Sequence, residues 1–336
     1  MGPVSHPRWT CGPPPNGADV DPELAIAVPL IPDFPFTDID GSRRALDELI
    51  AAFPVDMGGV HVQDRLVPGP AGAPDVPVRI FTPLSGDPGV QPGVLDIHGG
   101  GFALGMVALD DAANAAIARD VGAVVVSVEY RLAPEHPFPA PAEDCYSALV
   151  WFAAHAAELG VDPARIAVLG DSAGGGLAAT TALLARDRGG PALAMQVLIE
   201  PELDDRLDTH SMRTGADTVG WNNAQAGHSW RYYLGGRPAT EYAAPARMAD
   251  LSGLPPTYLT VNELDCLRDE GLEYARRLLV AGVSTELHCW PGAFHGFATL
   301  LPTARVALWA GAVLHDALCR GLRVDVDDLD LTALRT

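Results

Sequence analysis

Apolar positions along the chain change their spacing near residue 60, where short apolar runs begin to alternate with longer Ala-rich segments. The first two runs alternate with polar residues, which is typical of antiparallel strands with one wet face. The later runs are almost wholly apolar, which is typical of parallel strands covered on both faces. We expect eight strands, at 60–67, 76–82, 94–98, 123–129, 166–170, 195–200, 257–261 and 285–290.

Helix-compatible segments fill most of the intervals between these runs. We expect helices at 110–121, 141–158, 173–187, 268–281 and 303–319. Strands that alternate with helices form β-α-β units. The predicted fold class is therefore α/β, with an eight-stranded, mostly parallel sheet flanked by helices.

One long segment, 203–245, interrupts this alternation, because it separates two strands by far more than a crossover helix needs. It carries Trp221, Trp230, Tyr232 and Tyr233 in a chain that is only 7% aromatic. An aromatic insert after a parallel strand fits a cap over a pocket, although each ring could equally belong to the core.

The remaining divisions follow from composition. The N-terminal segment, 1–59, is rich in Pro and Gly over its first 20 or so residues, which we expect to be irregular, and has its best amphipathic stretch at 46–53. We assign 60–202 and 246–322 to one core, and expect the acidic tail, 323–336, to be solvated.

Charge and composition exclude several functions. The net charge of −21 disfavours nucleic acid and anionic membranes as partners, since both require basic patches. The chain has no lysine, and all 22 basic residues are arginine. Schiff-base and pyridoxal-phosphate chemistry, a Walker A site and a Ser-Lys dyad are therefore excluded.

The five cysteines are widely spaced and include no C-x-x-C, which indicates reduced thiols rather than a disulfide framework. The first 17 residues have no apolar core typical of a secretory signal. No stretch approaches the roughly 20 apolar residues that span a bilayer. We therefore expect a cytoplasmic protein.

The stretch VLGDSAGGG, 168–176, places a serine between an apolar run and a helix-compatible run. Gly170, Ser172 and Gly174 fit the G-x-S-x-G nucleophile elbow, in which small residues let strand and helix pass at a sharp turn. A phosphate cradle is the other interpretation, but neither phosphate-loop motif is present.

A serine nucleophile needs a histidine base and an acid that orients it. In chain order the acid and the base follow later strands, which favours Asp265 and His295. Glu263 is the main competitor for the acid, and Asp269 is another. The rival histidines precede the elbow or fall in helix, insert or strand segments.

The stretch HGGGF, 98–102, follows the third predicted strand. Consecutive glycines cost conformational entropy, and they leave backbone N–H groups free to approach an oxyanion. We assign the oxyanion hole to Gly100, Gly101 and Ala173, with Gly99 as a further possibility. We expect His98 to anchor the loop.

These motifs together resemble the hormone-sensitive-lipase-like carboxylesterases of the α/β-hydrolase fold, over roughly residues 60–320. The matching stretches are HGGGF (98–102), EYRLAPEHPFPAPAEDC (129–145), GDSAGGGLA (170–178), LPPTYLTVNELD into LRDEG (254–271) and HGF (295–297). The resemblance implies Ser172, Asp265 and His295 as the catalytic triad. It also implies a helical cap built from the N-terminal segment and the insert, short-chain ester substrates, and no metal or cofactor.

The chain departs from the family pattern at two places near the predicted site. Cys266 follows Asp265 where the family usually has proline, and Glu200 precedes Pro201 where an aromatic residue is usual. Further carboxylates follow, at Glu202, Asp204 and Asp205. They could alter the preferred substrate charge, or pair with an arginine such as Arg131.

Our hypothesis is a serine carboxylesterase that takes a small-molecule ester. Phe102, Met106, Trp221 and Trp230 are candidate pocket walls, with simple packing as the alternative. An amidase or peptidase would use the same triad, and a non-catalytic receptor on the same fold is a further alternative. The last strand could lie at a sheet edge and allow a homodimer.

Overall fold

The computed structural model describes residues 20–324 except 33, 53–54 and 85–89. Its eight strands form one sheet in the order β1-β2-β4-β3-β5-β6-β7-β8. The strands are β1 (Val60–Val67), β2 (Val76–Pro83), β3 (Gln91–Ile97), β4 (Val124–Val128), β5 (Val161–Asp171), β6 (Met195–Ile199), β7 (Thr257–Asn262) and β8 (Thr285–Trp290). Strand β2 runs antiparallel to its neighbours β1 and β4, and the other pairs are parallel. The predicted α/β sheet is confirmed.

Helices connect the strands and extend the fold at both ends. They are α1 (Pro22–Ala25), α2 (Ile39–Ala52), α3 (Asp111–Val121), α4 (Ala140–Ala154), α5 (Ala173–Asp187), α6 (His210–Thr214), α7 (Asn223–Leu234), α8 (Arg268–Val280), α9 (Phe297–Leu300) and α10 (Arg305–Gly321). Short 3₁₀ turns lie at Val28–Leu30, Val107–Leu109, Gly215–Asp217 and Pro245–Arg247. Five of these helices match the predicted ones, but α4 ends four residues early. There the chain turns through Gly160, at φ 68°, to enter β5.

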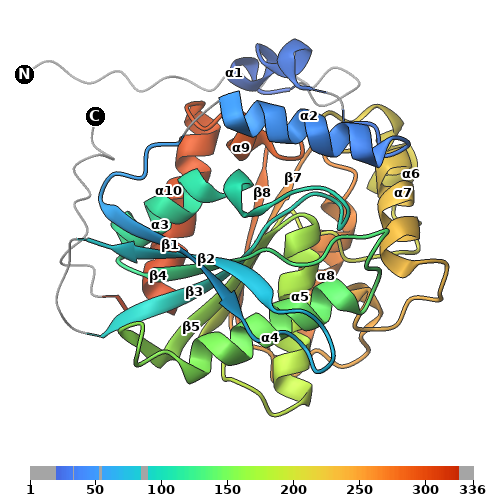
Figure 1. Cartoon of the computed structure of the whole chain (residues 1–336). Helices are drawn as coiled ribbons and strands as arrows, with labels where there is room; N and C mark the ends of the chain where they lie inside the picture. Colours follow the sequence, from blue (N-terminus) through green and yellow to red (C-terminus); the bar gives the residue numbers. More distant parts are fainter. Residues whose placement is uncertain (1–19, 33, 53–54, 85–89, 325–336) are drawn as a thin grey trace, which may run out of the picture.

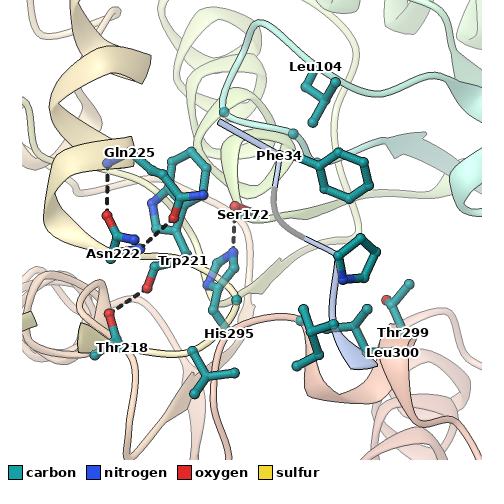
Figure 2. A pocket seen from close by; sticks show the side chains of 18 of the residues that line it. Phe34, Leu104, Ser172, Thr218, Trp221, Asn222, Gln225, His295, Thr299 and Leu300 are labelled. Atoms are coloured by element: carbon teal, nitrogen blue, oxygen red, sulfur yellow. Dashed lines mark hydrogen bonds between the residues drawn. The ribbon is translucent and has the colours of Figure 1, made fainter. Parts of the chain in front are cut away.

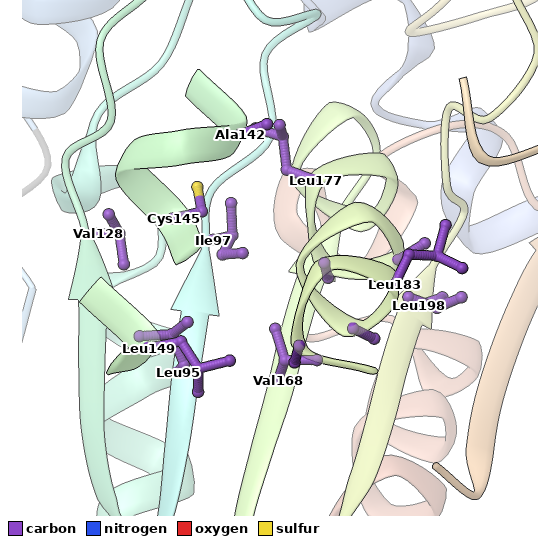
Figure 3. Packing of buried hydrophobic residues seen from close by; sticks show 14 of the residues in the cluster. Leu95, Ile97, Val128, Ala142, Cys145, Leu149, Val168, Leu177, Leu183 and Leu198 are labelled. Carbon is purple, nitrogen blue, oxygen red and sulfur yellow. The ribbon is translucent and has the colours of Figure 1, made fainter. Parts of the chain in front are cut away.

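Helices cover both faces of the sheet, as the apolar strands require (Figure 1). Helices α4, α5 and α8 pack on one face, and α3 and α10 pack on the other. Successive strand residues therefore enter opposite cores. Leu95, Val126 and Val168 face the first layer, whereas Val94, Val125 and Ala167 face the second. Figure 3 shows the first layer, in which Leu95, Leu149 and Leu177 pack between sheet and helices.

Two segments meet over the carboxyl ends of the central strands and share one cavity there. One is the N-terminal stretch from α1 to α2, and the other is the insert that carries α6 and α7 (Figure 1). Helix α7 is well bounded, since Asn222 and Gln225 form a capping box and Gly235 ends the helix at φ 57°. The proposed division into core and cap stays a prediction.

The expectations for the first 20 residues and for the tail at 323–336 fall almost wholly outside the described residues. Within the described ranges, no helix combines the length and apolar character needed to cross a membrane.

Candidate active site

Ser172 occupies the turn between β5 and α5, and its backbone has φ 55°. Positive φ is strained for a residue with a side chain, and such strain costs about 1–3 kcal/mol and is common at functional sites. The flanking glycines make the turn possible. A Cβ on Gly170 would lie 2.1 Å from the Gly174 carbonyl oxygen, and one on Gly174 would lie 1.9 Å from that of Ile97. Only glycine fits at either position.

The structure brings Ser172, His295 and Asp265 into one hydrogen-bonded chain. His295 Nε2 lies 2.8 Å from Ser172 Oγ, and Nδ1 lies 2.7 Å from Asp265 Oδ2. Figure 2 shows the first of these contacts at the edge of the cavity. All three side chains are buried. This order of contacts matches a nucleophile, a base and an orienting acid.

The two rival acids point elsewhere. Glu263 accepts a hydrogen bond from the Gly292 N–H at 2.8 Å. Asp269 accepts from the Ser211 N–H and pairs with Arg268. Asp265 is thus the candidate that contacts His295 at hydrogen-bond distance.

Glu200 supplies a second carboxyl group near His295. Its Oε2 lies 3.9 Å from His295 Nδ1 and accepts from the Asn262 amide, while Oε1 accepts from the Gly296 N–H at 2.8 Å. Burial raises the pKa of Glu200 well above its usual range. Burial lowers the pKa of His295, but Asp265 and Glu200 raise it by more, so the net shift is upward.

A metal ion is geometrically conceivable among the same side chains. Ligand atoms of Glu200, Asp265 and His295 all lie within 4.8 Å of one another. The imidazole, however, already contacts Ser172 and Asp265 through its two nitrogens. A metal would have to displace one of these contacts, so the arrangement fits a triad better than a cation site.

The glycine loop after β3 lies beside Ser172 and adopts conformations that exclude side chains. Gly100 has φ 117°, and a Cβ there would lie 2.1 Å from the Leu104 carbonyl oxygen. Gly101 has φ 57°, and a Cβ would lie 2.6 Å from the Trp221 ring. Within the described residues, neither N–H donates to a protein acceptor. Ala173 begins α5, so its N–H has no preceding turn to bond.

Neighbouring groups hold this loop in place. His98 is buried and stacks on Tyr130 at 4.2 Å, and the Tyr130 hydroxyl donates to the His98 carbonyl at 2.9 Å. From α2, Arg43 Nε donates to the Ala103 carbonyl at 2.9 Å, and Nη2 donates to that of Ala133 at 2.8 Å. Arg43 also pairs with Glu135 at 2.7 Å. One arginine therefore joins the N-terminal segment to the glycine loop.

The cavity beside Ser172 has a volume of about 540 Å³ (Figure 2). Ser172, His295 and the three loop glycines border it, together with parts of both covering segments. The covering residues include Val28, Ile31, Phe34, Phe36, Trp221, Asn222 and Gln225, and Leu300 of α9 adds a further wall. The aromatic pair at DFPF, 33–36, was the sequence signal that could have identified the N-terminal wall.

Three of the four expected pocket walls lie outside this lining, and Trp221 is the exception. The Phe102 ring stacks on that of Tyr233, with 3.9 Å between the ring centroids, and its centroid lies 5.5 Å from that of Trp230. These rings pack the insert onto the loop. Met106 precedes the short 3₁₀ turn Val107–Leu109 and does not line the cavity, although Leu109 of that turn does. These ring contacts favour simple packing for Phe102 and Trp230, and the structure gives Met106 no role at the cavity.

The extra carboxylates after β6 do not pair with Arg131, which forms a salt bridge with Asp144 at 2.7 Å. Two of them do pair with an arginine, but the partner is not Arg131. Asp204 pairs with Arg206 and Asp205 pairs with Arg247. Glu200 and Glu202 are buried, and no described salt bridge joins either to an arginine.

Comparisons with known proteins bear on the fold and the activity. A family model described as "alpha/beta hydrolase fold" matches residues 94–299. Carboxylesterase NlhH of Mycobacterium tuberculosis is 41% identical over 89% of this chain and 97% of its own length. Ethyl acetate hydrolase of Pseudomonas putida is 35% identical over 66% of this chain and 71% of its own length.

Among solved structures, a bacterial heroin esterase superposes with a TM-score of 0.88 at 50% identity, covering 90% of this chain and 98% of that chain. The sheet, the glycine loop and these relatives agree on fold and activity. The chain belongs to the hormone-sensitive-lipase-like carboxylesterases of the α/β-hydrolase fold.

Proposed function

We propose that Ser172, His295 and Asp265 hydrolyse carboxylic esters through an acyl-enzyme intermediate. The observation that carries the proposal is the hydrogen-bonded chain from Asp265 through His295 to Ser172 Oγ, with contacts of 2.7 and 2.8 Å. A serine hydroxyl is a weak nucleophile, so it needs a base at this distance.

In the first half of the reaction, Ser172 Oγ attacks the ester carbonyl while His295 Nε2 takes its proton. The N–H groups of Gly100, Gly101 and Ala173 stabilise the negative oxygen that develops. Asp265 holds Nδ1–H and stabilises the imidazolium. His295 then protonates the leaving alcohol. In the second half, water attacks the acyl-enzyme with His295 again as base, which releases the acid and restores Ser172.

We further propose that the acyl group is short. The cavity is within the usual range for small-molecule sites, about 300–1,000 Å³. Phe36 and Trp221 meet edge to face at 5.0 Å and bound the space beside Gly101. The relative named ethyl acetate hydrolase supports a test with acetyl esters. The two segments over the strand ends would act together as the cap.

Hydrolysis of p-nitrophenyl esters from acetate to laurate tests both proposals. Ser172→Ala should lower kcat by about 10⁴-fold or more. The matched control is Ser252→Ala, which replaces an exposed serine that lies well after Ser172 in the sequence. This variant should behave as wild type. Equal activity of wild type and Ser172→Ala would refute the triad. Faster turnover of laurate than of acetate would refute the short acyl site.

The oligomeric state stays a prediction. Strand β8 is one edge of the sheet, which is compatible with pairing between two copies. Light scattering after size exclusion would measure it.

A further inference from the structure

Glu202 is a fully buried carboxyl group that the reaction described above does not use. It follows β6, and its backbone N–H donates to the Ser172 carbonyl at 2.9 Å. Its side chain reaches Ser229 of α7, which is also fully buried. Ser229 in turn contacts Gly101 of the glycine loop. These contacts link the insert, the strand end and the proposed oxyanion hole.

The number of protons available decides how these groups are bonded. Ser229 Oγ lies 3.0 Å from the Gly101 carbonyl oxygen and 3.2 Å from Glu202 Oε2. A hydroxyl has one proton to donate, and a carbonyl oxygen can only accept. An ionised Glu202 can also only accept, so one contact would then lack a proton. Both contacts are hydrogen bonds only when Glu202 is protonated and donates to Ser229 Oγ.

The surroundings of Glu202 also favour its neutral form. Its Oε1 has no hydrogen-bond partner within the described part of the chain. Burying an unpaired charge is costly. The titratable groups that face it are His295, Asp265, Cys266, Glu270 and Tyr233. Burial raises the pKa of Glu202 to about 8, against the lowering effects of the Ser229 hydrogen bond and His295.

We propose that Glu202 is a positioning residue for the oxyanion hole: as a neutral acid it donates to Ser229, and Ser229 donates to the Gly101 carbonyl. The proposal rests on the role of the Gly101 N–H given above. Gly101 sits at φ 57° and has no side chain to restrict it. The carbonyl belongs to the peptide plane that follows Gly101, and a hydrogen bond on it anchors that plane. The residue then has less freedom to rotate, which limits the movement of its N–H.

The neutral form is populated below the raised pKa and is lost as pH increases through it. Ionised Glu202 draws the Ser229 proton to itself, because a hydrogen bond to a charged acceptor is the stronger one. The Gly101 carbonyl then loses its donor, and the loop loses this restraint. We therefore expect kcat to fall above pH 8 for a reason unrelated to His295.

The first test compares the infrared spectra of wild type and Glu202→Gln one to two pH units on either side of the pKa of about 8. The difference spectrum should contain a carboxylic-acid C=O band on the acidic side, and this band should disappear on the alkaline side. Absence of the band on the acidic side overturns the proposal. The measurement requires no turnover, so it separates this proposal from the triad itself.

The second test is the pH dependence of kcat with p-nitrophenyl acetate. A glutamine amide donates to Ser229 at every pH, so Glu202→Gln should remove the fall in kcat at alkaline pH. Ser229→Ala should lower kcat by about tenfold with little change in KM. In Ser229→Ala, adding Glu202→Gln should then change nothing further. Thermal unfolding checks that each variant is folded. An alkaline fall identical in wild type and Glu202→Gln overturns the proposal.

Discussion

Gly174 offers a sharp test of how the nucleophile turn is built. It lies in the first turn of α5, two residues after Ser172. A Cβ there would lie 1.9 Å from the Ile97 carbonyl oxygen and 2.5 Å from that of His98. Both oxygens belong to the backbone of β3 and the glycine loop, so no side chain can rotate away. Gly174→Ala must therefore move α5 away from β3.

The size of that movement follows from the contact distance. Cβ atoms essentially never approach within 3.0 Å, so relieving a contact of 1.9 Å requires a shift of 3.0 − 1.9 = 1.1 Å. Overpacking of this kind costs about 1–3 kcal/mol of stability. A 1 Å displacement of reacting groups costs about 100-fold in rate. We expect kcat/KM to fall by that factor, about 2.7 kcal/mol of transition-state stabilisation.

Steady-state hydrolysis of p-nitrophenyl acetate and thermal unfolding measure the two effects. Gly311→Ala is the control, since a Cβ at that helical glycine meets nothing within 4 Å. It should leave activity unchanged and add up to about 1 kcal/mol of stability. A Gly174→Ala variant with wild-type kcat/KM and unfolding temperature would refute the close packing of α5 against β3.

Three further predictions concern the triad and its pocket. Asp265→Asn should lower kcat by about 10³- to 10⁴-fold while the protein stays folded, and a loss below tenfold would contradict its role as orienting acid. The kcat/KM of wild type should fall as pH decreases through a His295 pKa above the ordinary value of about 6.5, because protonated His295 cannot act as base. In Asp265→Asn this fall should move to lower pH, and an unmoved profile would exclude the carboxylate as its cause. Trp221→Ala removes a cavity wall and should raise the hexanoate-to-acetate ratio of kcat/KM by on the order of 10-fold; an unchanged ratio would place the acyl chain elsewhere.

The strand pattern and the motif order were sufficient to predict the sheet and the residues that meet at Ser172. Parallel strands buried on both faces leave short apolar runs, and the elbow requires glycine where any Cβ would meet backbone. Those requirements are local, so a sequence displays them directly.

Other features depend on tertiary contacts that no local pattern encodes. Phe102 and Trp221 are both aromatic, yet the first packs beneath α7 and the second lines the cavity. Arg131 forms its salt bridge with Asp144, a carboxylate 13 positions away in the sequence, and not with the carboxylates after β6. The proton on Glu202 is a consequence of burial beside Ser229, and the sequence shows only that an unusual carboxylate is present.

The contacts of Arg43 have a consequence for how substrate enters. Arg43 contacts Ala103 beside the glycine loop, and Ala133 and Glu135 in the segment after β4. One side chain therefore joins α2 to the loop. If α2 lifted away as a lid, the carbonyls of Ala103 and Ala133 would lose the hydrogen bonds that Arg43 donates to them. We therefore expect α2 to keep its place beside the glycine loop throughout turnover, rather than to lift and settle again with each substrate.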